Sequence, residues 1–195
     1  MKYTPIAIVV VALIAIIGLV ASMYIVTEKD QVFITRFGEI QGDATTNAGL
    51  YFKVPFIDKV RRFEKRILEW DGRPGHVTTK DKRFIVIDSY ARWRISDPIY
   101  FFWRLKNEVF AQSRLDDILD STTRITVAKT EWVEFVRSDK SRKAISNDIL
   151  EDSREKVEGS GYGIELLDFQ FKRITPVNPS QSFPPKPVES KKVGQ

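Results

Sequence analysis

The sequence predicts an α+β fold: one N-terminal transmembrane helix, followed by a small domain in which an antiparallel-rich sheet packs against helices. Three observations predict it. The chain opens with a long uncharged apolar run, its first half then alternates with period two, and its second half changes to a helical period before one last alternating segment. Strands that come before helices, rather than between them, favour this class over a repeating βαβ architecture.

Residues 6–26 form the predicted membrane anchor. No charged residue lies between Lys2 and Glu28, and a helix of about 20 apolar residues crosses a hydrocarbon core ~30 Å thick. A cleaved signal peptide with its cleavage site at 20–22 is the alternative, but the apolar core here is longer than such peptides use. The residues that mark the predicted span are Ile6, Val10, Ile14, Gly18, Tyr24 and Val26.

The charges beside this run predict its orientation. Lys2 and the α-amino group precede the run, whereas residues 28–30 follow it with one net negative charge. The positive-inside bias then puts residues 1–5 in the cytoplasm and the domain, residues 27–175, on the other side of the membrane.

The first half of the domain is expected to be built from strands. They are predicted at 31–37, 48–54 and 60–70, with a polar loop at 41–47. A hairpin formed by 76–79 and 83–95 follows, around the short polar loop Lys80-Asp81-Lys82. Its second strand has two faces, one with Tyr90, Arg92 and Arg94 and the other with Ala91, Trp93 and Ile95.

Helices are expected after the hairpin. Ser96-Asp97-Pro98 is a helix start, because Asp caps a helix well and Pro fits its first turn. Leu115, Ile118 and Leu119 share a helical face, and residues 141–158 form a second helix. Residues 163–174 return to a strand, and residues 176–195, with five prolines, form a disordered or extended tail.

Composition excludes several kinds of chemistry. The chain has no Cys, which excludes disulfides, thiol nucleophiles and Cys-rich zinc sites, and its single His, His76, is expected on the surface. The net charge of +5 lies mostly at the two ends, so the domain is nearly neutral and no nucleic-acid partner is expected. Asp116 and Asp120 share a helix face, where an ion-paired surface stripe with Arg124 is expected rather than a metal site. No catalytic residue, cofactor or metal is predicted.

Three blocks of the sequence resemble a known family. The first is RFG at 36–38 with AGLYFKVPFIDKV at 48–60, the second is TKDK at 79–82 with YARWRISDP at 90–98, and the third is RLDDILDS at 114–121 with YGIELLD at 162–168 and KRI at 172–174. In order and spacing they resemble the stomatin/prohibitin/flotillin/HflK-HflC superfamily (SPFH, or band 7), and within it the bacterial HflC type. The resemblance covers residues 27–175 and includes the anchor before them.

The resemblance implies a bacterial inner-membrane protein with one span and a periplasmic domain. HflC-like proteins join HflK-like partners in a large cage around the membrane-bound ATP-dependent protease FtsH, and the family has no accepted catalytic residues. In the family a long charged helix follows the last strand, whereas here Pro176 and Pro179 come soon after Ile174. The expectation is therefore a chain that stops before this assembly helix, as a fragment, a truncated gene product or a divergent short member.

Two groups of apolar residues are predicted to contact a neighbour. Tyr100, Phe101, Phe102 and Trp103 open a helix, where they either pack in the core or face another subunit or the membrane surface. Phe56 and Ile57 follow Pro55 in a turn, and the resemblance, which puts the domain near the bilayer, makes them membrane-surface candidates.

The predicted function is that of a membrane-anchored scaffold without enzymatic activity. It is expected to oligomerise with itself or an HflK-like partner and to modulate an FtsH-type protease. Two alternatives stay open. One is a membrane-anchored peptidase, although no nucleophile-and-base motif is found in the sequence. The other is a truncated extracytoplasmic binding domain that does not assemble.

Overall fold

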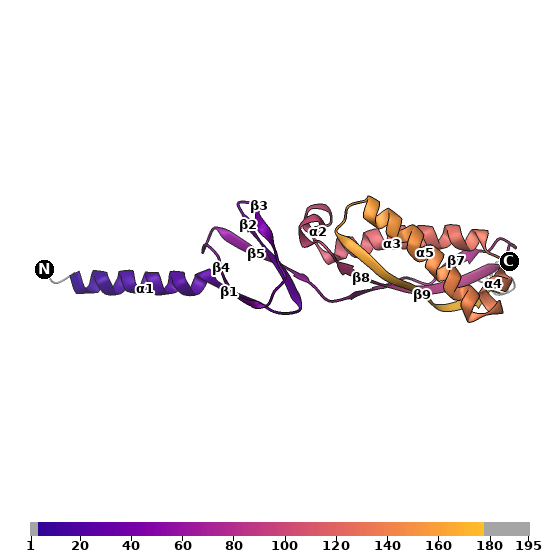
Figure 1. Cartoon of the computed structure of the whole chain (residues 1–195), viewed down its shortest axis with the longest axis horizontal. Helices are drawn as coiled ribbons and strands as arrows, with labels where there is room; N and C mark the ends of the chain where they lie inside the picture. Colours follow the sequence, from indigo (N-terminus) through magenta and orange to yellow (C-terminus); the bar gives the residue numbers. More distant parts are fainter. Residues whose placement is uncertain (1–3, 178–195) are drawn as a thin grey trace, which may run out of the picture. The chain divides into compact units, whose positions relative to one another are not determined.

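The computed structural model describes residues 4–177 (Figure 1). Its elements, in chain order, are α1 (Thr4–Ser22), β1 (Met23–Val26), β2 (Asp30–Arg36), β3 (Glu39–Thr45), β4 (Gly49–Phe52), β5 (Asp58–Glu64), β6 (Leu68–Asp71), β7 (Gly75–Thr78), β8 (Phe84–Ile95), α2 (Pro98–Arg104), α3 (Glu108–Lys129), α4 (Trp132–Arg137), α5 (Asp139–Gly159) and β9 (Ile164–Pro176). The α+β class predicted from the sequence is confirmed. From residue 178 on, the predicted tail lies outside the described residues.

The chain divides into two compact units. The first comprises the residues up to 68 together with 93–111 and 157–165. The second comprises 69–92, 112–156 and the described residues from 166 to 177. Five elements, β6, β8, α3, α5 and β9, contribute residues to both units.

Helix α1 ends earlier than the sequence predicts. The prediction was wrong for residues 23–26, which form strand β1 and pair antiparallel with β4. The pairing buries Tyr24 and Val26 and stacks Tyr24 on Tyr51 with ring centroids 5.8 Å apart, so this apolar segment gains a partner strand that local pattern does not reveal. Among the described residues, no helix has the length and apolarity expected of a membrane-crossing segment.

A three-stranded sheet in the order β3-β2-β5 forms the centre of the first unit. The strand predicted at 31–37 is β2, whereas the loop predicted at 41–47 was wrong, because most of it lies in strand β3. β3 is an edge strand that pairs with β2 and buries no side chain fully, so it carries polar residues that resemble a loop. The predicted strand at 60–70 is divided between β5 and β6.

An aromatic cluster joins α2 to this sheet. Asp97 caps α2, since its carboxylate accepts hydrogen bonds from the backbone N–H groups of residues 99 (2.8 Å) and 100 (3.1 Å). The cap, with Pro98 in the first turn, confirms the predicted helix start. Phe101 is fully buried and meets Phe63 edge-to-face at 5.3 Å, while Phe102 meets Phe33 in the same way at 5.4 Å.

Strand β8 organises the second unit, where β6, β7 and β9 all pair with it. Figure 1 shows β9 running beside β8. Its odd-numbered residues from 85 to 91 are buried, and its even-numbered residues are more exposed, as the alternation predicts. On that outer side Arg92 forms an ion pair with Asp168 of β9 at 2.7 Å, and the Tyr90 hydroxyl donates to Gln170 at 3.2 Å. Arg92 and Tyr90 thus belong to a polar ladder across two strands, as the alternating faces predict.

Candidate functional site

Two turns at one end of the first sheet present phenylalanine side chains to solvent. Phe37 follows β2 and is 88% exposed, and Phe56 precedes β5 and is 93% exposed. Both adopt left-handed backbone conformations, with φ of 52° and 68°, which side-chain-bearing residues disfavour by about 1 kcal/mol or more. We call these two side chains the aromatic tips. Exposing two large rings on disfavoured backbone has no folding advantage and indicates a contact surface.

An ion pair between a half-exposed Arg36 and a buried Asp58 holds the two turns. The Arg36 guanidinium donates to both carboxylate oxygens of Asp58, at 2.8 and 3.2 Å, and the Val54 N–H donates to the same carboxylate at 2.9 Å. Arg36 and Asp58 are opposite one another in the β2–β5 register, directly beside Phe37 and two residues from Phe56. The Arg36 guanidinium, followed by the Val54 N–H, holds the pKa of the Asp58 carboxyl below its usual range.

We expect Asp58→Asn to lower the stability of the fold at neutral pH and to loosen the turn at 54–58. The lowered pKa means that the folded state favours the carboxylate, so this stabilisation is complete above the ordinary Asp pKa of about 4 and is lost as pH falls through the lowered folded-state value. Denaturant midpoints of the two proteins should therefore differ at neutral pH and converge in acid. A difference that persisted unchanged in acid would contradict this role of the ion pair.

The hollow between the tips combines apolar and basic groups. It has a volume of about 360 Å³, and Ile57, Lys59 and Arg61 line it together with Phe37 and Phe56. Ile57, a membrane-surface candidate from the sequence, is 40% exposed. Aromatic rings beside basic side chains suit the boundary between lipid headgroups and acyl chains.

The ribbon of β1 and β4 adds a second apolar surface. Its exposed side chains oppose one another in register, Met23 with Phe52 and Ile25 with Leu50, while Tyr24 and Tyr51 lie on the buried side. The sequence interpretation missed this surface and Phe37. The signal in each case was local: large apolar residues alternating in a short segment, and a phenylalanine directly before a turn glycine.

The predicted run at 100–103 is divided between core and surface. Phe101 is fully buried and Phe102 is partly buried, so both serve packing. Tyr100 is 60% and Trp103 is 63% exposed. Tyr100 and Trp103 therefore remain available for a contact with a neighbour, and Phe110 at the start of α3 is exposed as well.

The predicted anchor residues fall into two sets. Gly18 lies in α1 and is partly buried, whereas Tyr24 and Val26 belong to the buried side of the β1–β4 ribbon. For Ile6, Val10 and Ile14 the helical backbone is described, but their side chains lie outside the described part.

The titratable residues weighed in the sequence lie on β7 and α3. His76 is exposed on β7, and its backbone carbonyl accepts a hydrogen bond from Arg124 at 3.3 Å. Asp116 accepts a hydrogen bond from the indole N–H of Trp70 at 2.6 Å. The expected ion-paired stripe of Asp116, Asp120 and Arg124 was therefore wrong. Asp116 bonds to Trp70 instead, and Arg124 bonds to the carbonyl of His76. Within the described residues, no three His, Asp or Glu side chains gather as a metal site would require.

Comparison with known families identifies the family of the chain. A model of the SPFH domain / Band 7 family matches residues 24–181. The chain belongs to this family. Both compact units lie largely within the matched SPFH region, and the resemblance noted in the sequence blocks is confirmed.

Curated relatives of the SPFH chain include several HflC proteins. Protein HflC of Borreliella burgdorferi is 35% identical over 154 residues, which cover 77% of this chain and 47% of the relative. Protein HflC of Treponema pallidum is 38% identical over 133 residues, covering 68% and 40%. The Modulator of FtsH protease HflC of Escherichia coli is 28% identical over 162 residues, covering 80% and 44%. The chain thus spans less than half the length of each of these relatives.

Proposed function

We propose that this chain is an HflC-like, membrane-anchored SPFH scaffold that modulates an FtsH-type membrane protease. The observation that carries the proposal is the match of the SPFH model over residues 24–181, together with similarity to a relative named as a modulator of FtsH protease. Its role is contact rather than chemistry, so we propose no catalytic residue.

The proposed anchor is the apolar N-terminal segment. The segment includes helix α1, whose 19 residues carry no charged side chain. We propose that this helix crosses a bacterial inner membrane with residues 1–5 in the cytoplasm and the domain in the periplasm. The uncharged stretch between Lys2 and Glu28 supports the span, and the charges on either side support the orientation.

The aromatic tips and the outer face of the β1–β4 ribbon are proposed to rest on the membrane surface. The ribbon follows α1 without an intervening loop, so it begins where the helix ends. Burying one phenylalanine side chain in an apolar environment contributes about 1.5–3 kcal/mol, and two tips add to an anchor that already holds the chain at the surface.

A nitroxide label at position 56 should report lipid contact. The chain has no Cys, so Phe56→Cys provides a unique attachment site, and Lys140→Cys provides an exposed control on α5. In vesicles, we expect the label at 56 to collide several-fold less with a water-soluble nickel complex, and more with oxygen, than the label at 140. Equal collision rates at the two positions, measured by electron paramagnetic resonance, would contradict membrane contact by the tips.

We propose that modulation works by confinement in an oligomer. Weak contacts repeated around a ring of anchored domains add up to a stable assembly, and such a ring restricts the lateral access of membrane substrates to an enclosed protease. Tyr100 and Trp103, exposed on α2, are candidates for contacts with a second copy or an HflK-like partner.

Co-purification tests the proposed assembly. Crosslinked membranes that contain this chain, an HflK-like protein and an FtsH-type protease should yield all three proteins when the chain is captured. A variant with Tyr100→Ser and Trp103→Ser should recover less of the HflK-like protein while remaining folded. A strictly monomeric chain that captures neither protein would contradict the proposal and favour a binding domain that does not assemble.

A further inference from the structure

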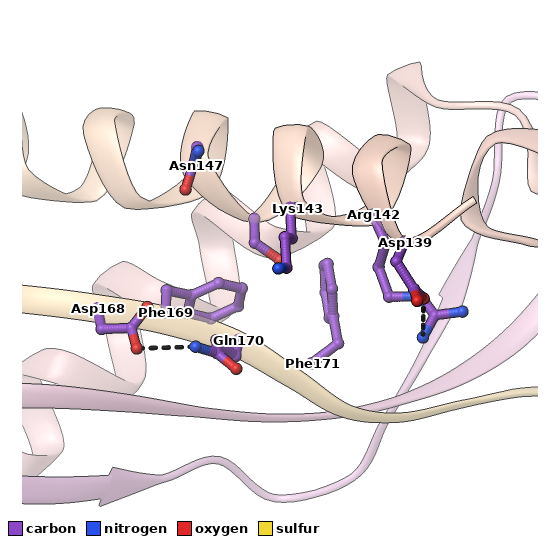
Figure 2. Close-up of a pocket in the computed structure, with 9 residues that line it drawn as sticks. Asp139, Arg142, Lys143, Asn147, Asp168, Phe169, Gln170 and Phe171 are labelled. Atoms are coloured by element: carbon purple, nitrogen blue, oxygen red, sulfur yellow. Dashed lines mark hydrogen bonds and ion pairs between the residues drawn. The ribbon is translucent and has the colours of Figure 1, made fainter.

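A groove in the second unit lies between the first half of α5 and residues 168–171 of β9 (Figure 2). Its volume is about 350 Å³, enough for a few residues of extended chain rather than a large cofactor. Figure 2 shows Lys143 and Arg142 extending from α5 on one side, with Phe169 and Phe171 on the β9 side.

The strand that borders the groove has a free edge. Among the described residues, β9 pairs with β8 alone. Arg154 of α5 donates to the carbonyls of Leu166 at 2.8 Å and Leu167 at 3.0 Å, so it covers the beginning of β9. From Asp168 onward no such side chain covers the edge in the described part of the chain. Edge strands with open N–H and C=O groups are templates on which another chain can pair.

The floor of the groove is apolar. Phe171 meets Phe169 edge-to-face at 5.4 Å and Phe135 at 5.9 Å, so these rings form a firm surface under the edge. Ser146 lines the groove as well and is only 6% exposed.

The charged side chains of the groove leave a positive charge without an ion pair among the described residues. Asp168 is neutralised by Arg92 at 2.7 Å, and the carboxylate of Asp139 faces Arg142 at 3.8 Å. Arg142 also donates to the carbonyl of Phe135 at 3.3 Å. Lys143 is exposed, and in the described part of the chain it has no ion pair. A ligand that carries a carboxylate would therefore complement the site.

We propose that this groove binds an extended, acidic segment of a partner protein, which adds a strand to the open edge of β9 and places a carboxylate at Lys143. Main-chain hydrogen bonds would supply most of the affinity, and the lysine and the phenylalanine floor would select the sequence. The inference goes beyond the proposed scaffold function and does not depend on it.

Peptide binding to the full chain in detergent micelles tests the proposal. The probe is a fluorescent peptide of about eight alternating valine and threonine residues with one central glutamate, and its twin carries glutamine instead. By fluorescence anisotropy, we expect the glutamate peptide to bind about fivefold more tightly. Lys143→Gln should abolish that preference, whereas Lys140→Gln, on the same helix but outside the groove, should retain it.

Backbone methylation of the peptide tests strand addition separately. Methyl groups on one alternate set of peptide nitrogens should abolish binding, and methyl groups on the other set should leave it unchanged, because only one set faces β9. Equal effects of the two sets, equal affinities of the glutamate and glutamine peptides, or no binding at about 1 mM would overturn the proposal. Self-association of the chain that the peptide does not displace, and that Lys143→Gln weakens, would also overturn it by placing a second copy in the groove.

Discussion

Gly163→Ala should destabilise the domain by about 3 kcal/mol or more. Gly163 has φ of 67°, and a Cβ atom there would lie 2.8 Å from the backbone nitrogen of Phe101 and closer still to the carbonyl oxygen of Asp97. The obstructing atoms belong to the capped first turn of α2, so they cannot move aside as a flexible side chain can. The same glycine carbonyl accepts hydrogen bonds from residues 96 and 97, which ties the end of β8 to this loop.

Gly161→Ala is the matched control for this effect. Gly161 also has a left-handed backbone, with φ of 61°, but a Cβ atom there would meet nothing within 4 Å. Gly161→Ala should lower the free energy of unfolding by about 1 kcal/mol, because only the left-handed backbone conformation disfavours alanine there. Denaturant unfolding monitored by circular dichroism measures both variants. Equal losses of unfolding free energy in the two variants would show that the clash with α2 does not destabilise Gly163→Ala.

Phe101→Ala is expected to have a similarly large effect, about 3–5 kcal/mol. Its ring is fully buried and contacts Phe63 and Trp93, with centroids 5.3 and 6.4 Å away, so its removal leaves a cavity at the centre of the first unit. Tyr100→Ala, one position earlier on the same helix, removes a ring that is 60% exposed and should change stability by less than about 0.5 kcal/mol.

The pair of variants also separates packing from association. If Tyr100 serves a contact with a neighbouring subunit, Tyr100→Ala should weaken assembly without lowering the unfolding midpoint, whereas Phe101→Ala should lower the midpoint itself. Thermal unfolding and native mass measurement in detergent report the two properties. A loss of stability in Tyr100→Ala as large as in Phe101→Ala would show that the whole run at 100–103 belongs to the core.

Features with a local signal were the predictable part of this fold. The alternation in β8 correctly predicted that Ala91 and Trp93 lie on the opposite face from Arg92. Asp97-Pro98 correctly predicted the start of α2. The helix predicted at 141–158 is α5, because an apolar stripe and a terminal glycine are both local.

Features that depend on a distant partner could not be read from the pattern. β1 resembles the end of an apolar helix until β4, more than twenty residues later, pairs with it. β3 resembles a polar loop because its place at the sheet edge requires no buried face. The aromatic tips show the same limit, since Phe56 was expected at a surface but Phe37 was missed. The two side chains come together only through the β2–β5 register and the pair of Arg36 with Asp58.

Degradation by a reconstituted membrane protease tests the central claim most directly. Vesicles would contain an FtsH-type protease and a membrane-embedded substrate, with or without this chain and an HflK-like partner, and a soluble substrate would serve as the comparison. We predict that the two partners slow degradation of the membrane substrate and leave the soluble substrate unaffected, and that the chain degrades nothing when the protease is absent. Unchanged rates for both substrates, or proteolysis by the chain alone, would contradict a scaffold that modulates the protease.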